Sequence, residues 1–432
     1  MIRVGLVGYG LSGRVFHAPL IGATPGLRLT AVVTSDAARA TQARQDIPGV
    51  LVTDTLDDLL GGEARVDLVV IAAGNAGHVP IAQRAVAARV AVVVEKPLAP
   101  TSAEGRTLVQ QAEDAVVPLT VFHNRRWDDD FLTLRALLAS GDLGVVHRFE
   151  SRFERWSPSL RESGWREDPD PSQGAGLLLD LGSHLVDQAI LLFGPVASVS
   201  AELDRRRPAS AVDDDVFVAL THVNGVRAHL WASSVAARPG PRFRVLGSRA
   251  GFTCFGLDPQ EQQLRDGLRP GDPGWGMRPP DQQGTVGVGD QVGAVPAAPG
   301  AYQAFYLELV HALEGGGPLP VEPWDAVRVL AVLDAAREAA TARTVATVPD
   351  GGRAEAGARG QGRLLTRREP ATIASAAATP THPAPTHTAV KDSDEATTPK
   401  TRGPIAVPAP PPTCTIDVAF ASLPRFEPTT PR

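Results

Sequence analysis

The first 122 residues alternate short apolar runs with segments of helical periodicity. Runs suited to buried parallel strands occupy residues 4–7, 29–34, 66–72, 91–95 and 119–122. Helical patterns fill residues 80–88 and 102–114, and Ser102 is the expected N-cap of the second helix. This alternation predicts an α/β fold over residues 1–122, with a doubly wound parallel sheet that binds ligands beyond the C-terminal strand ends.

After residue 123 the pattern changes to long stretches of strand-like alternation separated by helices. We expect helices over residues 131–139, 180–193, 302–314 and 322–342. Strands are expected over residues 146–156, 196–205, 215–223, 227–235 and 242–247, joined by Gly, Pro and Asn turns. The segment 267–300, rich in Gly, Pro and Asp, is expected to be a long excursion. Residues 123–347 therefore predict a second, α+β domain with a large, open and mainly antiparallel sheet and helices on one face.

The last part of the chain, residues 348–432, shows neither helical nor strand-like periodicity. From residue 351 onward it carries 13 of the 38 prolines, with many threonines and few aromatic residues. Such a segment buries too little apolar surface to offset its ordering entropy, so we expect a disordered tail.

Three glycines follow the first predicted strand in the pattern G-x-G-x-x-G, within the stretch Gly8, Tyr9, Gly10, Leu11, Ser12, Gly13. Gly8 would allow a tight turn, Gly10 would let the backbone approach a pyrophosphate, and Gly13 would let the next helix pack closely on the strand. The free N–H groups at that helix N-terminus attract phosphate. Because a strand precedes the stretch and a helix and a second strand follow it, the stretch predicts a dinucleotide-binding loop.

The tip of the second strand bears on the choice of cofactor. An NAD enzyme usually places Asp or Glu there to hold the ribose hydroxyls. Here Thr34 and Ser35 are small, and Arg39 follows one turn later, which favours NADP because an arginine can pair with the 2′-phosphate. Asp36 favours NAD if it turns inward, but it is equally suited to cap the following helix. We therefore expect NADP, with NAD possible.

Composition narrows the class of protein. The chain has 432 residues, 43% of them hydrophobic, and a net charge of −6 without a basic block, so nucleic acid is not an expected partner. It has two cysteines, Cys254 and Cys414, which excludes a disulfide framework. No apolar run reaches the ~18 residues that cross a bilayer, and the first strand leaves no room for a signal peptide. These features predict a cytoplasmic protein with no membrane association.

Lys96, Asp180 and His184 are the residues best suited to catalysis. Oxidation of a hydroxyl requires a base with a pKa near neutrality and a cation that stabilises the developing alkoxide. His184 suits the first task and Lys96, directly after a strand, suits the second. Asp180 lies four residues before His184 on the predicted helix, where it would orient the imidazole, raise its pKa or bind a substrate hydroxyl.

A polar cluster, His123, Asn124 and Arg125, marks the expected junction of the domains. It would clamp substrate hydroxyls, or else form an interdomain ion-pair network. Trp165 and Arg166 follow a loop that would cover the site, unless Arg166 is only structural. A hydrolase triad is excluded because no G-x-S-x-G elbow holds a serine, and nothing completes a metal site around Asp180, His184 and Asp187.

These motifs resemble the glucose–fructose oxidoreductase / inositol dehydrogenase / rhizopine-catabolism (Gfo/Idh/MocA) family over residues 1 to about 347. The stretches 8–13, 15–20, 122–128 and 180–188, together with Glu95-Lys96-Pro97, are most similar to the subgroup of NADP-dependent scyllo-inositol dehydrogenases. The resemblance implies a Rossmann domain followed by an α+β domain with an open sheet, through which members often form oligomers.

The resemblance also implies roles for individual residues. Lys96 would contact the reacting hydroxyl and the nicotinamide ribose, and His184 would be the acid/base. Asp180 would bind a substrate hydroxyl or orient the imidazole. Asn75 and His78 match part of a cofactor-side P-N-x-x-H segment, although Gly74 replaces its proline, and Glu95 belongs to the cofactor side of the E-K-P motif. Asp36 stands where the subgroup often has an arginine.

The predicted activity is hydride transfer between NAD(P) and a secondary hydroxyl or ketone of a cyclic polyol or sugar, as in an EC 1.1.1-type dehydrogenase. The expected partners are this small molecule and further copies of the chain. Two alternatives remain open from the sequence: a family aldose dehydrogenase, and a nucleotide-binding regulator without catalysis. Family members of the second kind lack the E-K-P lysine, which this chain has.

Overall fold

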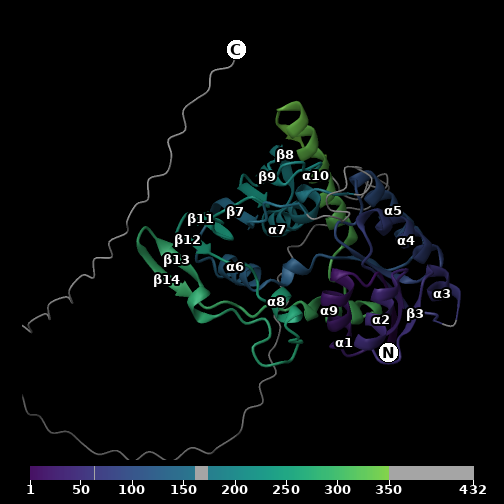
Figure 1. The fold of residues 1–432 in the computed structure, drawn as a ribbon. Helices are drawn as coiled ribbons and strands as arrows, with labels where there is room; N and C mark the ends of the chain where they lie inside the picture. The colour runs from purple at the N-terminus through teal and green to yellow at the C-terminus, as the bar shows by residue number, and fades with distance from the viewer. Residues whose placement is uncertain (63, 161–173, 350–432) are drawn as a thin grey trace, which may run out of the picture. The chain divides into compact units, whose positions relative to one another are not determined.

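Two β-sheets, each flanked by helices, organise the chain (Figure 1). The computed structural model describes residues 1–62, 64–160 and 174–349, all of which belong to one structural unit. The predicted tail from residue 350 onward, and Trp165 and Arg166, lie outside the described residues.

The first sheet is parallel throughout, with the strand order β3-β2-β1-β4-β5-β6. It confirms the predicted doubly wound sheet. The order reverses between β1 and β4, and there the C-terminal strand ends open a crevice for a ligand. The strands are β1 (Ile2–Val7), β2 (Leu27–Val33), β3 (Leu51–Thr53), β4 (Leu68–Ile71), β5 (Ala91–Glu95) and β6 (Leu119–Phe122).

Short helices connect these strands, and two of them depart from the prediction. The helix expected from Pro80 begins earlier, at Asn75, and contains Pro80 in its interior. The N-cap of α5 is Thr101 rather than Ser102, because Thr101 has the extended backbone of a cap and its hydroxyl accepts from the Glu104 amide. The connecting helices are α1 (Ala18–Gly22), α2 (Ala37–Asp46), α3 (Leu56–Gly61), α4 (Asn75–Ala87) and α5 (Ser102–Asp114), and α1 follows a π-helical turn, η1 (Ser12–His17).

The second sheet has nine strands in the order β14-β13-β12-β11-β7-β10-β9-β8-β15. Its neighbours pair antiparallel except β7 and β10, which are parallel, so the prediction of a mainly antiparallel sheet is confirmed. The strands are β7 (Val146–Glu154), β8 (Val196–Asp204), β9 (Asp215–His222), β10 (Arg227–Ser233), β11 (Phe243–Gly247), β12 (Gly251–Cys254), β13 (Gly284–Val288), β14 (Gln291–Val295) and β15 (Ala346–Thr347).

The segment expected to be an excursion contributes to this sheet. Within residues 267–300, β13 and β14 form a hairpin at the sheet edge, seen on the left of Figure 1. Its two-residue turn is Gly289-Asp290, with Gly289 at φ +57°. Glycines inside both strands hide the apolar alternation, which is why the sequence pattern did not reveal them. Strand β12 and the short helix α8 (Gln260–Arg265) were not predicted either.

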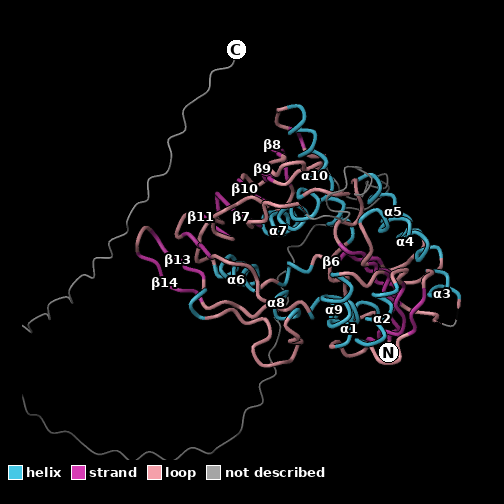
Figure 2. Tube along the Cα trace, in the orientation of Figure 1, coloured by secondary structure: helices cyan, strands magenta, loops and turns pink. Residues whose placement is uncertain are grey.

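Helices of the second part cover one face of its sheet and join it to the first sheet (Figure 2). They are η2 (Asn124–Trp127), α6 (Asp129–Ser140), η5 (Leu178–Gly182), α7 (Ser183–Phe193), α9 (Gln303–Leu313) and α10 (Pro323–Ala342), and η6 (Pro280–Gln282) precedes the hairpin. Helix α10 packs against α5, α7 and β8.

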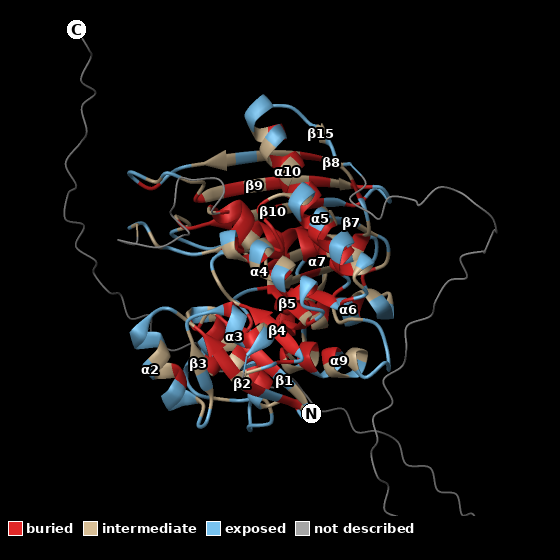
Figure 3. Cartoon of the chain, turned by 90° about the vertical axis from the view of Figure 1, so that its right-hand side faces the viewer, coloured by how far each residue is buried: buried red, intermediate tan, exposed pale blue. Residues whose placement is uncertain are grey.

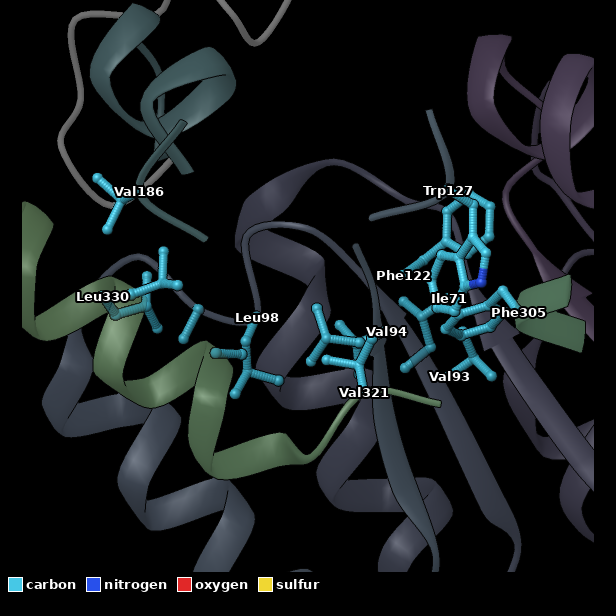
Figure 4. Close-up of a cluster of buried hydrophobic side chains, with 14 of the residues drawn as sticks. Ile71, Val93, Val94, Leu98, Phe122, Trp127, Val186, Phe305, Val321 and Leu330 are labelled. Atoms are coloured by element: carbon cyan, nitrogen blue, oxygen red, sulfur yellow. The ribbon is translucent and has the colours of Figure 1, made fainter. Parts of the chain in front are cut away.

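The core runs without interruption from the first sheet into these helices. The central strands of the first sheet are buried, strands β9 and β10 of the second sheet alternate between buried and more exposed positions, and the outer helix faces are exposed (Figure 3). Figure 4 shows Val93 and Phe122 of the first sheet beside Phe305 of α9, and Leu98 near Leu330 of α10. This continuous burial fixes the strand ends of the first sheet against the helices that carry Asp180 and His184. No helix among the described residues is both long and apolar enough to cross a membrane.

Candidate active site

The glycine loop after β1 has the geometry of a phosphate cradle. Gly8 has φ +99°, and a Cβ there would lie 2.5 Å from the carbonyl oxygen of Ala72. A Cβ on Gly13 would lie 2.1 Å from the carbonyl oxygen of Gly8, so η1 packs directly on the end of β1. A Cβ on Gly10 would meet no atom closer than Arg39 Nη1, at 3.8 Å. The loop is therefore tight at its two ends and open in the middle, which fits a bound pyrophosphate.

The other loop residues divide between core and cavity. Tyr9 is buried, and its hydroxyl donates to Asp46 Oδ2 at 2.9 Å, which leaves only its backbone for a cofactor. Leu11 is 44% exposed, and Leu11 and Ser12 both line the central cavity.

Just after the C-terminal end of β2, Asp36 and Arg39 place a carboxylate and a cation beside the glycine loop, where the adenosine ribose of a cofactor is expected. Asp36 is the N-cap of α2, where Oδ1 accepts from the amides of Ala38 and Arg39 at 2.9 and 3.0 Å. These hydrogen bonds lower the pKa of Asp36. Arg39 Nε lies 3.6 Å from Asp36 Oδ2, and the guanidinium reaches toward Gly10. Thr34 is half-buried and Ser35 is exposed. The capping role considered for Asp36 is thus confirmed.

A cavity of about 450 Å³ lies where the strand ends of the first sheet meet η5, α7, β7 and α8. It brings together most of the side chains singled out from the sequence. Those that line it are Leu11, Ser12, Asn75, His78, Glu95, Lys96, Asn124, Arg125, Asp180 and His184.

Lys96 and Asp180 form an ion pair in this cavity. Lys96 Nζ donates to Asp180 Oδ1 at 2.8 Å and to the backbone oxygen of Asp180 at 2.7 Å. The two side chains are only 14% and 12% exposed. Asp180 lies in the π-helical turn η5, a kind of turn that is frequent at functional sites. An ammonium has three N–H donors, so one remains for a ligand after these two hydrogen bonds.

His184 lies one turn further, in α7, with 5% of its surface exposed. Its ring packs edge-on near those of His123 and Phe153. Burial lowers the pKa of His184 well below its usual value, and the charges of Lys96 and Arg125 lower it further. The imidazole is therefore neutral at pH 7 and competent to accept a proton.

The expectation that Asp180 raises the pKa of His184 is wrong. Asp180 is bound to Lys96, and among the described residues His184 Nδ1 has no hydrogen-bond partner. The physical reason is that burial and nearby positive charges dominate the pKa of His184, while the Asp180 carboxylate is paired with Lys96.

Asn75 and His78 hold two backbone segments at the cavity, and only His78 contacts the turn after Lys96. Asn75 Nδ2 donates to the carbonyl oxygen of Gly174 at 2.8 Å. His78 Nδ1 lies 2.7 Å from the carbonyl oxygen of Pro97, and burial lowers the pKa of His78. The neutral ring thus donates to the turn that follows Lys96.

The cluster at residues 123–125 belongs partly to the cavity and partly to an ion-pair network. Arg125 pairs with Asp128 at 3.3 Å and with Glu261 at 3.4 Å, and lies 4.8 Å over the ring of Phe153. His123 is buried, with Nδ1 3.8 Å from Asp187 Oδ2. Asn124 and Arg125 line the cavity. Trp165 and Arg166 lie outside the described residues.

Asp187, considered as a metal ligand with Asp180 and His184, accepts two hydrogen bonds from Arg126 at 2.6 and 2.9 Å. In the part of the chain that is described, no group of three or more His, Cys, Asp or Glu residues is placed to hold a metal ion.

The sequence did not predict one wall of the cavity. It comes from the end of β7 and from α8 with the residues before it, and α8 also contacts η1. A short polar helix between Pro259 and Gly267 carries too few periodic positions to be recognised, and those two helix-breaking residues are the only signal. The residues of this wall are Phe153, Glu154, Arg155, Leu257, Asp258, Glu261, Gln262 and Arg265.

Comparison with known proteins matches both halves of this architecture. Residues 2–123 match the model of an oxidoreductase family with an NAD-binding Rossmann fold, and residues 135–348 match the C-terminal α/β domain of the same family. The cradle described above fits such a dinucleotide.

Relatives match over nearly their whole length. The uncharacterized oxidoreductase YdgJ of Escherichia coli K12 is 40% identical, over 79% of this chain and 97% of its own. The scyllo-inositol 2-dehydrogenase (NADP(+)) IolW of Bacillus subtilis is 32% identical, over 78% and 93%. Among solved structures, YPO2259 of Yersinia pestis superposes with a TM-score of 0.74 at 38% identity, covering 81% of this chain and 97% of its own. The chain belongs to the Gfo/Idh/MocA family of oxidoreductases.

Proposed function

We propose that the chain is an NAD(P)-dependent dehydrogenase that interconverts a secondary hydroxyl and the matching ketone of a cyclic polyol or sugar, with scyllo-inositol as the model substrate. The observation that carries this proposal is the Lys96 ammonium, fixed by two hydrogen bonds to Asp180 in the same cavity as a neutral histidine. Two relatives named as inositol dehydrogenases support the substrate class.

Each residue of this set would have one task. The remaining N–H of Lys96 would donate to the substrate oxygen and stabilise its developing negative charge. The Nδ1 atom of His184 is buried, so Nε2 would face the cavity and accept the proton of the substrate hydroxyl. Asp180 would hold Lys96 in place. A bound nicotinamide supplies the carbon that accepts or gives the hydride.

Substrate hydroxyls other than the reacting one require polar partners around the cavity. Asn124 and Arg125 offer an amide and a guanidinium on one side, and Glu261 and Gln262 offer a carboxylate and an amide from α8. Both donors and acceptors are thus available, as a polyol requires.

We propose NADP as the cofactor. Arg39 reaches over the Gly10 turn, and the exposed Ser35 beside it leaves space for a 2′-phosphate. The name of IolW, an NADP(+) enzyme, supports the same choice.

We further propose a cytoplasmic homo-oligomer that assembles through the second sheet. The strand residues that alternate with the buried ones form a half-exposed face, and Phe217 and Trp231 lie on it with ring centroids 5.1 Å apart. Arg152 lies 3.9 Å over the Trp231 ring. Aromatic rings and stacked arginines of this kind are typical of interface cores.

The experiment is a set of initial rates, read as reduced-nicotinamide absorbance, for inositols and aldoses with NADP+ and NAD+ separately. Activity on scyllo-inositol with NADP+ supports the whole proposal, and activity on an aldose alone corrects the substrate. Cofactor binding without turnover of any of them contradicts the dehydrogenase and favours a regulator.

A further inference from the structure

Glu95 is a buried carboxylate that the proposed reaction does not use. It ends β5 directly before Lys96, lines the cavity, and its side chain is 12% exposed. Three groups donate to it: the hydroxyl of Ser12, the ring of His17 through Nε2 at 3.1 Å, and the backbone amide of Lys96 at 3.0 Å. The phosphate loop, η1 and the E-K-P strand end thus converge on one carboxylate.

His17 is held in turn by Tyr306 of α9. His17 Nδ1 lies 2.6 Å from the Tyr306 hydroxyl, and both side chains are fully buried. A carboxylate only accepts, so His17 Nε2–H donates to Glu95, and His17 Nδ1 shares the second hydrogen bond with the Tyr306 hydroxyl.

Glu95 is therefore ionised. Burial acts to raise its pKa, but the hydrogen bond and the charge of His17, the Lys96 charge and the Ser12 hydroxyl outweigh burial and lower the pKa to about 2. The positive charge of Lys96 is already paired with Asp180. The Glu95 carboxylate thus places a negative charge in the cavity, beside the position where the proposed chemistry requires the nicotinamide.

This charge discriminates between the two states of the cofactor. The oxidised nicotinamide ring carries a positive charge and the reduced ring is neutral, whereas the rest of the dinucleotide is the same in both. We propose that Glu95, held by Ser12 and His17, makes the site bind the oxidised cofactor more tightly than the reduced one. The inference rests on the proposed cofactor site and goes beyond it by assigning Glu95 a role in setting the redox balance of the bound couple.

The test compares dissociation constants of NADP+ and NADPH, measured by quenching of tryptophan fluorescence, and repeated with NAD+ and NADH. Glu95→Gln removes the charge and keeps the shape of the side chain. It should shift the ratio of the two constants toward the reduced form by at least about tenfold, since a unit charge acts within a few ångströms in a low-dielectric site. An unchanged ratio in a variant that still binds both forms overturns the inference.

Two further variants control for structural effects. Glu95→Asp keeps the charge and should hold the ratio within about threefold of the wild type. Glu113→Gln removes a charge from a partly buried glutamate that binds Trp324 outside the cavity, and should leave the ratio unchanged. A shift in Glu95→Asp or Glu113→Gln equal to that in Glu95→Gln also overturns the inference. Failure of the wild type to bind either form would instead contradict the proposed cofactor site itself.

Discussion

Two glycines of the phosphate loop should respond in opposite ways to the same substitution. Gly13→Ala would place a Cβ 2.1 Å from the carbonyl oxygen of Gly8, which is more than 1 Å closer than an ordinary contact. Because that oxygen belongs to the backbone, it cannot rotate away, and η1 must lift from β1. Overpacking of this kind costs about 1–3 kcal/mol, equivalent to a fall in Tm of about 1–4 °C for a fold of this size.

Gly10→Ala meets a different environment. Its Cβ would have 3.8 Å of clearance to Arg39, and Gly10 does not have a positive φ. The folded protein should be unchanged or stabilised by about 0.4–1 kcal/mol, because alanine restricts the unfolded chain. The methyl group would, however, occupy the space of the pyrophosphate. Loss of one hydrogen bond to a charged group, about 1.5–3 kcal/mol, weakens cofactor binding by about 10- to 150-fold.

The assay is thermal unfolding without cofactor, together with a fluorescence titration of NADP+ and NAD+, for both variants. The reasoning predicts that Gly13→Ala lowers Tm and that Gly10→Ala lowers affinity at unchanged Tm. It is refuted if Gly10→Ala binds cofactor as the wild type does, or if Gly13→Ala melts at the wild-type temperature.

Three further predictions follow from the same structure. Burial and the charges of Lys96 and Arg125 lower the pKa of His184, so its base form persists on acidification. The kcat/KM should therefore stay level as the pH falls through 6.5, and decline only well below that value. A pH–rate profile whose acid limb lies at or above pH 6.5 would contradict this. Asp187→Asn breaks a buried pair in which Arg126 and Asp187 are 9% and 3% exposed, and should cost about 3–5 kcal/mol in urea unfolding. Asp57→Asn is its control, because the Asp57–Arg84 pair is 81% and 50% exposed and should cost less than about 1 kcal/mol; equal losses would refute the argument. Removal of residues 350–432, which begin after the family match ends at residue 348, should change Tm by less than about 2 °C, and a larger fall would show that the tail supports the fold.

Much of the fold could be predicted because apolar periodicity is a local property of the sequence. The parallel strands of the first sheet are mostly short apolar runs, and β9 and most of β10 alternate between buried and more exposed positions. The hairpin β13–β14 could not be found in this way, since glycines occupy positions that would otherwise show the alternation. Its pairing with β12 depends on contacts that the local pattern does not contain.

The residues of the site could be predicted where a sequence motif indicates their chemical role. Lys96, Asp180 and His184 do lie in one cavity, but Asp180 pairs with Lys96, a residue 84 positions earlier that the i, i+4 spacing to His184 does not indicate. The α8 wall and the Glu95–His17–Tyr306 chain were not found, since both depend on residues that are distant in sequence. Tyr306, for example, lies 289 positions after His17.

The measurement that tests the central claim most directly is turnover and cofactor affinity of Lys96→Ala, determined side by side with the wild type on the best substrate. Loss of the ammonium that we propose to contact the reacting oxygen should reduce kcat by at least about 100-fold. Cofactor affinity should stay within about threefold, because the glycine loop supplies the phosphate contacts. Wild-type turnover in this variant would contradict the assignment of the cavity around Lys96, Asp180 and His184 as the active site.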